Sequence, residues 1–576
     1  MNDRRGARLL LTPPPTSLST LCLTLRLAAP LVVCMPLAAQ AAEPPPGAGS
    51  ILQQIQPANP PAPTSKGTGL SIEQDGRTNL PPSAPFLVKN IQLSGNTLFD
   101  TATLHALVAD AEGKNLTLSQ LGDLAARLTD YYRSHGYPLA RAIVPAQTIQ
   151  AGAVRMQIIE ARYGKIQLDN HSRVTDSLIG ATLSPLQGGQ AVAQRPLDHA
   201  LLLLSDIPGV AVSATLKPGD AVGTSDLQVD AGAAPAVTGN AALDNYGNRY
   251  TGRARLAGTV DFIDPLHHGD VLSLTALSSG SGLNYGGLSY ESMLDGRGTR
   301  LGASYTALHY ELGDTLEALN GHGTAQVESL WLKSPFLRSH DVNLYAQMQY
   351  DHKQLDDHLD TASIRTDRHL DNLTASLAGD LHDSVLSGSI STWNVGWTVG
   401  RVDFDDGTAR QVDAATAHAQ GSFSKWTANL FRVQSLSARD ALYLTLSGQW
   451  ADSNLDPAEK MVAGGPYTVR AYDVGAESGD TGILGSAEFR HELVQVRNGP
   501  LQAVAFFDAE RVTVDHSAWI AGTNAVTLRG AGLGLNWAGG DQWHGRIYVA
   551  APIGRTPELI GSNNSVHTWL EIGKAF

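Results

Sequence analysis

The residues with the clearest chemical potential are one arginine in a glycine-rich segment and one aspartate further along the chain. Arg470 lies within Val469-Arg470-Ala471-Tyr472, a loop-like segment between two stretches that we expect to be strands. In residues 501–510 every second side chain suits lipid, so a period of two turns Phe506 and Asp508 to the opposite face. An arginine and a carboxylate brought together form a charge-assisted pair. From the residues alone, two unrelated polar side chains remain the simpler interpretation.

Signatures of the common enzyme classes do not occur in the chain. It has no Walker A loop, no HExxH motif and no GxSxG elbow. Gly530, Gly532 and Gly534 alternate within a strand-like segment, which favours close approach of strands over a nucleotide loop. The pair His267-His268 lies in a predicted loop, where we expect it to be solvated. We therefore predict no catalytic residue, no metal site and no cofactor, and regard an enzyme as the least favoured class.

The N-terminus has the pattern of a secretory signal peptide over residues 1–41. Arginines precede an apolar stretch at 27–39, and a small-residue cleavage site ends at Ala41. A membrane anchor is the alternative, but the apolar run is short and contains prolines. A lipoprotein is disfavoured because Val33 precedes Cys34, where lipidation requires a small residue.

Removal of this peptide defines the chemistry of the exported chain. Both cysteines, Cys22 and Cys34, leave with it, so the remaining 535 of 576 residues contain no disulfide and no thiolate site. The formal charge of −14 becomes −17, because the peptide holds four arginines and one aspartate. A chain this acidic has no basic face for nucleic acid, so we expect no nucleic-acid partner.

Composition divides the rest of the chain into four parts. Residues 42–84 are rich in proline, which is typical of an extended linker, with one short helix-prone island at Ser50 to Gln56. Residues 85–161 follow a β-α-α-β-β pattern, and residues 162–235 repeat it more weakly. From 236 to 576 short alternating strands are separated by turn residues.

The C-terminal part predicts an outer-membrane β-barrel. Beyond the signal peptide the chain has no run of 18 apolar residues, so a helical membrane span is not expected. Export without cysteine, alternation with one polar face and a terminal Phe576 together favour a barrel. A large soluble β-sandwich or propeller is the alternative.

Three motifs together give the sequence a family resemblance. The segment Leu243-Asp244-Asn245-Tyr246-Gly247 is similar to an opening strand motif, Val469-Arg470-Ala471-Tyr472 to a Val-Arg-Gly-Tyr loop tetrad, and Phe506-Phe507-Asp508 to a Phe-x-Asp strand motif. The chain thus resembles the TpsB transporters of two-partner secretion, the hemolysin secretion/activation family of POTRA-plus-barrel outer-membrane proteins. The resemblance implies a plug helix, two POTRA domains (85–161 and 162–235) and a barrel of sixteen antiparallel strands. Ala471 departs from the pattern, because alanine resists the positive φ that glycine accepts.

The resemblance implies an outer-membrane translocase with POTRA domains in the periplasm. Its partner would be a secreted TpsA-like exoprotein of hemolysin, adhesin or toxin type, which the sequence does not identify. Lipid and the barrel assembly machinery, through Phe576, are the other expected partners. We expect strand addition at an edge strand, Val210 to Leu216, helped by an apolar groove beside the Leu201 to Leu204 helix. An assembly factor that inserts other barrels is the alternative, followed by a passive porin.

Overall fold

The computed structural model describes residues 45–55, 70–72, 82–561 and 566–576. The predicted signal peptide and most of the predicted linker lie outside these residues. Within the part that is described, no helix has both the length and the apolar character needed to cross a membrane.

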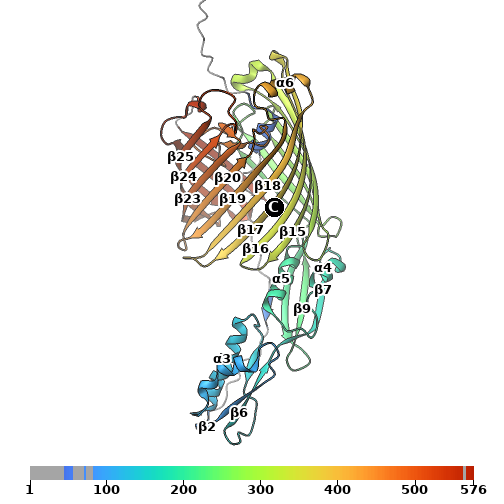
Figure 1. Cartoon of the computed structure of the whole chain (residues 1–576), viewed down its shortest axis with the longest axis vertical. Coiled ribbons are helices and arrows are strands. Elements are labelled where there is room, and N and C mark those ends of the chain that lie inside the picture. The colour runs from blue at the N-terminus through green and yellow to red at the C-terminus, as the bar shows by residue number, and fades with distance from the viewer. Residues whose placement is uncertain (1–44, 56–69, 73–81, 562–565) are drawn as a thin grey trace, which may run out of the picture. The chain divides into compact units, whose positions relative to one another are not determined.

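Sixteen antiparallel strands form a closed barrel, as the family resemblance implies. Each strand pairs with its neighbour in the chain, apart from the loop strands β21 and β22 (Figure 1). Strand β10 pairs with β27 and so closes the wall. The strands are β10 (Val237–Asp244), β11 (Arg255–Ile263), β12 (Val271–Ser278), β13 (Leu283–Met293), β14 (Arg300–Glu311), β15 (Gly321–Arg338), β16 (Val342–Leu359), β17 (Ile364–Asp383), β18 (Ser389–Phe404), β19 (Gly421–Ser435), β20 (Asp440–Ala451), β23 (Thr481–Val496), β24 (Gly499–Thr513), β25 (Ala525–Ala538), β26 (Trp543–Pro552) and β27 (His567–Ala575).

The two faces of the wall differ in chemistry, as alternation predicts. Large apolar side chains such as Leu332, Trp426 and Leu533 are exposed on the outer face, which suits contact with lipid. On β24, Phe507 is exposed whereas Phe506 and Asp508 are buried, so the period of two holds along this strand.

Short helices lie in the connections outside the modules described next. They are α6 (Gly407–Ala415), η2 (Asp314–Leu319), η3 (Asp360–Ala362), η4 (Gly540–Gln542) and η5 (Glu558–Ile560).

The first α/β module has its own apolar core. Its elements are β2 (Phe86–Val88), β3 (Asn90–Ser94), α2 (Thr101–Ala106), η1 (Ala109–Ala111), β4 (Lys114–Leu116), α3 (Leu118–Ser134), β5 (Arg141–Ile143) and β6 (Ala153–Ile159). Helix α3 begins at a capping box of Thr117 and Gln120 and buries Leu121, Leu124 and Leu128 at helical spacing. The sequence predicts one strand over 86–93, but the structure divides it.

That division places the two strand segments in different sheets. Strand β2 pairs with β4, whereas β3 pairs with β6. The break falls at Lys89, whose backbone N–H and that of Asn90 both donate to the carbonyl of Gly152.

The second module has the order β7 (Arg162–Asn170), α4 (Asp176–Leu183), α5 (Gln194–Ser205), β8 (Val210–Pro218) and β9 (Thr224–Ala233). Its sheet has the order β1-β8-β9-β7, where β1 (Leu70–Ile72) comes from the segment before the first module. The four leucines of the helix beside which an apolar groove is expected, Leu201 to Leu204, are all buried, so they offer no exposed apolar surface. Leu201 and Leu204, three positions apart on α5, pack into the module's own core.

The expected edge strand is also corrected in part. Strand β8 does lie next to the sheet edge, but β1 pairs in parallel with Ala214 to Leu216 and covers that stretch. Only the beginning of β8, from Val210 to Ser213, has no strand on its outer side among the described residues.

A buried carboxylate fixes one end of the first module. Glu160 accepts hydrogen bonds from the backbone N–H groups of Thr97 (2.7 Å) and Leu98 (2.9 Å) and from the hydroxyl of Tyr132 (2.8 Å). Burial alone would raise the pKa of Glu160, but these donors outweigh it and hold the pKa below its usual value. The ionised carboxylate therefore stabilises the folded module.

The change Glu160→Gln should destabilise the first module by about 1–3 kcal/mol, because buried donors lose their charged acceptor. Hydrogen–deuterium exchange on the full chain should show faster exchange in α3 and β6. The contribution of ionised Glu160 to the stability of the module is present at neutral pH and is lost as the pH falls through its lowered folded-state pKa. The difference in stability between wild type and Glu160→Gln should therefore disappear in acid. The control Asp110→Asn removes an exposed carboxylate paired with Arg127 and should change little. Equal exchange in wild type and Glu160→Gln at neutral pH would contradict this prediction.

Candidate functional site inside the barrel

The loop between β20 and β23, residues 452–480, folds back into the barrel and is called the lumen loop here. It contains a small hairpin of β21 (Met461–Ala463) and β22 (Glu477–Gly479). Val469 and Tyr472 are fully buried and pack against inward-facing side chains of β23 to β27. The loop turns at Gly464, Gly465 and Gly475, which all have positive φ.

Arg470 and Asp508 meet in the lumen, although they are 38 positions apart in the chain. The guanidinium donates from Nε to Oδ2 (2.9 Å) and from Nη2 to Oδ1 (2.8 Å) of Asp508. This is a bidentate, charge-assisted geometry. The ring of Phe506 lies under the guanidinium at 3.4 Å, so the two predicted residues of β24 both contact the arginine.

Two further residues, which the sequence analysis did not predict, also contact Arg470 and Asp508. Glu488 Oε2 accepts from Nη1 of Arg470 at 2.7 Å, and Ser486 Oγ donates to Oδ1 of Asp508 at 2.7 Å. Both lie on β23 with their side chains on the inner face. The one feature of the sequence that could have predicted this contact is Glu488 itself, a glutamate on the inner face of the strand next to β24.

Ala471 does not have a positive φ, so its backbone conformation is one that alanine adopts without strain. It is fully buried over Gly530 of β25, where a Cβ would lie 2.4 Å from the Cβ of Ala471. Trp569 of β27 donates from Nε1 to the carbonyl of Arg470 at 2.7 Å. The departure from the glycine pattern is therefore accommodated by a glycine on the facing strand.

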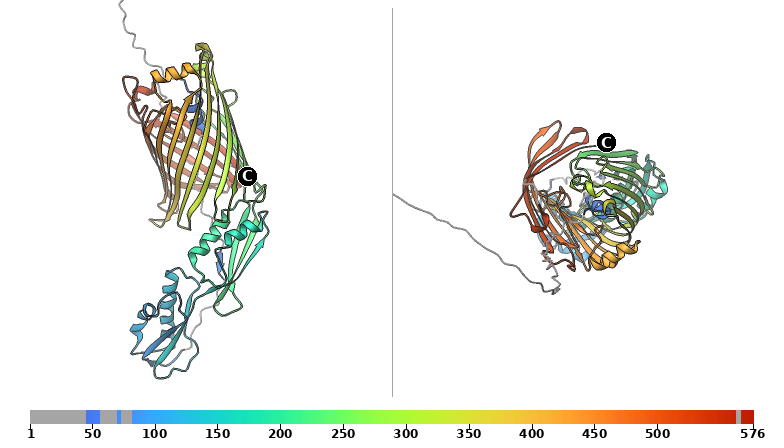
Figure 2. Two further views of the ribbon diagram at one scale, coloured as in Figure 1. Left: turned by 45° about the vertical axis from the view of Figure 1, so that its right-hand side comes forward. Right: turned by 90° about the horizontal axis from the view of Figure 1, so that it is seen from above.

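Helix α1 (Ala48–Ile55) lies inside the ring of barrel strands, where Figure 2 shows it in blue. Ile51 and Leu52 are buried in a cluster with inward-facing side chains of β14 to β18. The backbone N–H of Ala48 donates to Asp357 Oδ1 at 2.6 Å. Gln53 donates to the carbonyl of Ala458 in the lumen loop. The helix thus contacts both the wall and the loop.

A second set of buried charges connects the lumen loop to the wall beside α1. Glu459 accepts from Lys353 at 2.5 Å and from Lys425 at 2.8 Å. Arg368 pairs with Asp456 of the loop and, at 2.8 Å, with Asp357. Asp357 is the same carboxylate that accepts from α1.

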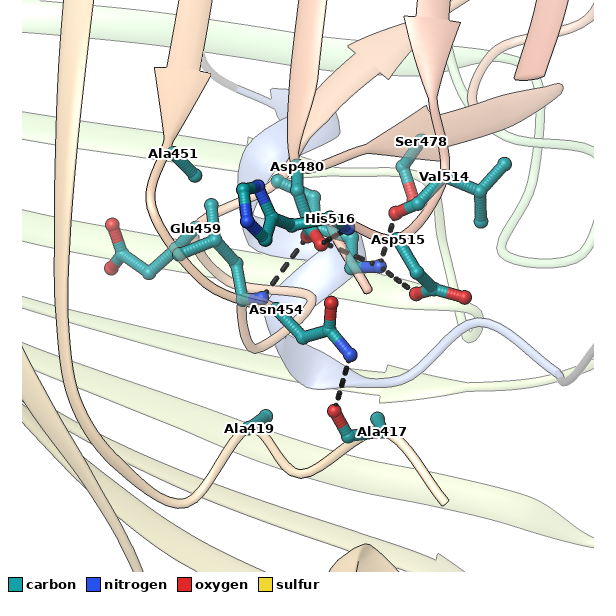
Figure 3. A network of polar contacts seen from close by, with 12 residues as sticks. Ala417, Ala419, Ala451, Asn454, Glu459, Ser478, Asp480, Val514, Asp515 and His516 are labelled. Atoms are coloured by element: carbon teal, nitrogen blue, oxygen red, sulfur yellow. Dashed lines mark hydrogen bonds and ion pairs between the residues drawn. The ribbon is translucent and has the colours of Figure 1, made fainter. Parts of the chain in front are cut away.

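A third network of polar contacts holds the two ends of the lumen loop (Figure 3). Asp480 accepts from the backbone N–H of Leu455 (3.1 Å) and of His516 (2.7 Å), and Lys460 bridges Asp480 and Asp515. These contacts join the beginning and the end of the loop to the connection between β24 and β25.

The opening motif 243–247 lies where the barrel closes. Asn245 donates to the carbonyl of Thr568 and accepts from the N–H of Leu570, both at 2.8 Å, and so continues the pairing of β10 with β27. Tyr246 packs edge-on against Trp569 and against Tyr467 of the lumen loop.

Comparisons with known proteins agree with this architecture. The family model described as haemolysin secretion/activation protein ShlB/FhaC/HecB matches residues 223–537, and the model of the ShlB-type POTRA domain matches residues 86–161. The heme/hemopexin transporter protein HuxB of Haemophilus influenzae (strain 86-028NP) is 27% identical over 484 residues, covering 83% of this chain and 84% of the relative.

Solved structures show the same fold. CdiB from Escherichia coli superposes with a TM-score of 0.68 at 21% identity, covering 89% of this chain and 94% of the other. BamA from Haemophilus ducreyi lacking POTRA domains 1–3 gives a TM-score of 0.51 at 12% identity, covering 85% of this chain and 100% of the other.

A closed barrel with an apolar outer belt, a filled lumen and an N-terminal POTRA domain defines an outer-membrane transporter whose POTRA domain is periplasmic. The chain belongs to the haemolysin secretion/activation protein family ShlB/FhaC/HecB. It is thus a TpsB transporter of two-partner secretion, and the reading as a barrel-inserting assembly factor is disfavoured.

The changes Arg470→Ala and Asp508→Ala should each strongly reduce secretion of the partner exoprotein, and the double variant should be little worse than either. Breaking a buried ion pair by removing one partner costs about 3–5 kcal/mol, so each single change already removes most of the stabilisation of the bidentate contact. Secretion is measured as exoprotein in the medium, with heat-modifiable migration of the barrel as the folding check.

The matched control is the pair Arg432 and Asp383, which is about one quarter exposed and bridged at 3.0 Å near the ends of β19 and β17. Its single variants should have little effect. Additive losses for Arg470 and Asp508 would show that the two residues act separately.

Proposed function

We propose that this chain exports one unfolded exoprotein, of hemolysin, adhesin or toxin type, through its barrel. The observation that carries the proposal is the filled lumen: α1 and the lumen loop both occupy it, and ion pairs and hydrogen bonds hold them against the wall. Such contents can be displaced for passage. The chain acts without catalysis and without a cofactor, and folding of the cargo outside supplies the direction.

The proposed division of labour follows the predicted boundaries. Residues 1–41 direct export, and 42–84 form the plug helix and its linker. Residues 85–161 and 162–235 are two periplasmic POTRA domains that bind the cargo, and 236–576 form the barrel. The order β7-α4-α5-β8-β9 supports the second POTRA assignment, because it repeats the β-α-α-β-β pattern. Lipid contacts the apolar belt on the outer face of the barrel, and the barrel assembly machinery recognises the C-terminal residue Phe576.

We propose that one tetrad fixes the lumen loop to the wall at Phe506 and Asp508. Its residues are Val469, Arg470, Ala471 and Tyr472. The bidentate pair and the buried apolar side chains on either side of it support this role.

Cargo recognition is proposed to occur by strand addition along β8. The N–H of Ala234 donates to the carbonyl of Gly209, and residues along an antiparallel ladder alternate between bonded and non-bonded pairs. The N–H of Val212 therefore points away from β9, toward the edge. Strand β1 already uses this edge from Ala214 onward, so a cargo strand longer than about four residues must displace it. Capture of cargo would then alter the segment that follows α1.

The change Val212→Pro should abolish binding of the exoprotein while sparing the fold, because it removes an edge donor and no bond to β9. Val212→Ala is the matched control, since it shortens the side chain but keeps the N–H. Binding of the N-terminal region of the exoprotein encoded by the neighbouring reading frame is measured with the full chain in detergent. Equal binding by both variants would refute strand addition at β8, and capture of unfolded barrel precursors instead would support an assembly factor.

Deletion of residues 42–56 should raise single-channel conductance in planar bilayers, because a helix about 10 Å wide leaves the lumen. Ile51→Asp places a charge in the apolar cluster around α1 and should change conductance in the same direction. Ser50→Ala, on the partly exposed side of the helix, is the control and should leave it unchanged. An unchanged conductance after the deletion would show that α1 does not obstruct the channel.

A further inference from the structure

Two histidines face each other near the end of the barrel wall that lies away from the start of β10. His322 on β15 is the register partner of His358 on β16. Directly opposite residues of an antiparallel pair project to the same face with their Cβ atoms about 5 Å apart. The ring centroids are 5.1 Å apart with the planes tilted by 31°. The imidazoles are thus neighbours that the strand register fixes.

A carboxylate completes a three-residue set. Asp360 begins the short helix η3, directly after β16, and its Oδ2 lies 3.4 Å from Nε2 of His322. Asn320 holds the same oxygen through a hydrogen bond of 2.7 Å from Nδ2. One donor atom from each of His322, His358 and Asp360 lies within 4.8 Å of the others. Ligands of a tetrahedral zinc ion are about 3.3 Å apart, so small side-chain rotations would close the set.

An independent observation at the same place is a buried oxygen that lacks a hydrogen bond. Oδ1 of Asp367 on β17 lies 3.9 Å from Nε2 of His358 and has no hydrogen-bond partner among the described residues. It can serve as a fourth ligand or orient the imidazole of His358.

We propose that His322, His358 and Asp360 form a site for a divalent transition-metal ion, with Asp367 as the supporting carboxylate. Two imidazoles with carboxylate oxygen suit Zn²⁺, Ni²⁺ or Cu²⁺, whereas Ca²⁺ and Mg²⁺ prefer oxygen ligands alone. This site could not be predicted from the sequence, because the two histidines are 36 positions apart and only the register of β15 with β16 pairs them.

The site lies outside the lipid-facing belt. On the outer face of β16 the exposed apolar side chains end at Tyr350, and His352, Gln354, Asp356 and His358 follow. Eight residues of strand span roughly 26 Å, which carries His358 well beyond the belt. His322 and His358 are each about one third exposed, so an ion can enter from water. A bound ion would join the ends of β15 and β16 to the turn at η3.

Isothermal titration of the full chain in detergent with Zn²⁺ tests the proposal, with the absorption of Co²⁺ as a second readout of ligand geometry. We expect one ion per chain, at least tenfold weaker binding in His322→Ala and in His358→Ala, and a smaller loss in Asp360→Asn. Heat-modifiable migration confirms that each variant remains a folded barrel.

The matched control is His352→Ala. His352 lies on the same face of β16 beside a carboxylate, but its Nδ1 already bonds Asp371 at 2.9 Å. Its removal should leave the Zn²⁺ isotherm unchanged. Wild-type affinity in both His322→Ala and His358→Ala would overturn the proposal, as would an equal loss in His352→Ala or the absence of stoichiometric binding by the wild type.

Discussion

The buried pair of Arg470 and Asp508 is the interaction on which the interior of this barrel depends. A guanidinium inside a protein is stabilising only when its lost hydration is replaced by well-aligned acceptors. Asp508, Glu488 and the face of Phe506 supply them, all from the wall strands β23 and β24. These contacts hold Arg470, and with it this part of the lumen loop, against β23 and β24.

The other buried charges extend this constraint to the helix inside the barrel. Arg368 of the wall is shared between Asp456 of the lumen loop and Asp357, which also accepts from the N-terminal end of α1. Withdrawal of the loop would leave Arg368 with one partner, and withdrawal of α1 would leave Asp357 without one of its donors. Loop, helix and wall thus form one electrostatic unit, which holds the contents of the lumen in place.

The sequence predicted the parts of this arrangement that depend on local period or on known motifs. Alternation along β24 turned Phe506 and Asp508 inward, and the tetrad placed Arg470 in a loop. It missed Glu488 and the network around Glu459, because lysines about 30 and 100 residues away meet that carboxylate only after the barrel closes. The strand break at Lys89 was missed for a similar reason, since its hydrogen bonds go to Gly152.

Strand length explains why the loop also matters for closure of the barrel. Strands β16 and β17 pair over eighteen residues, whereas β10 and β27 pair over five. Each missing pair removes backbone hydrogen bonds, so the contact of β10 with β27 is the shortest strand pairing of the wall. Asn245 extends it by two hydrogen bonds, and the lumen loop adds Tyr467 against Tyr246 and the carbonyl of Arg470 for Trp569. The loop that fills the lumen therefore also supports the shortest strand pairing, so its release would loosen both at once.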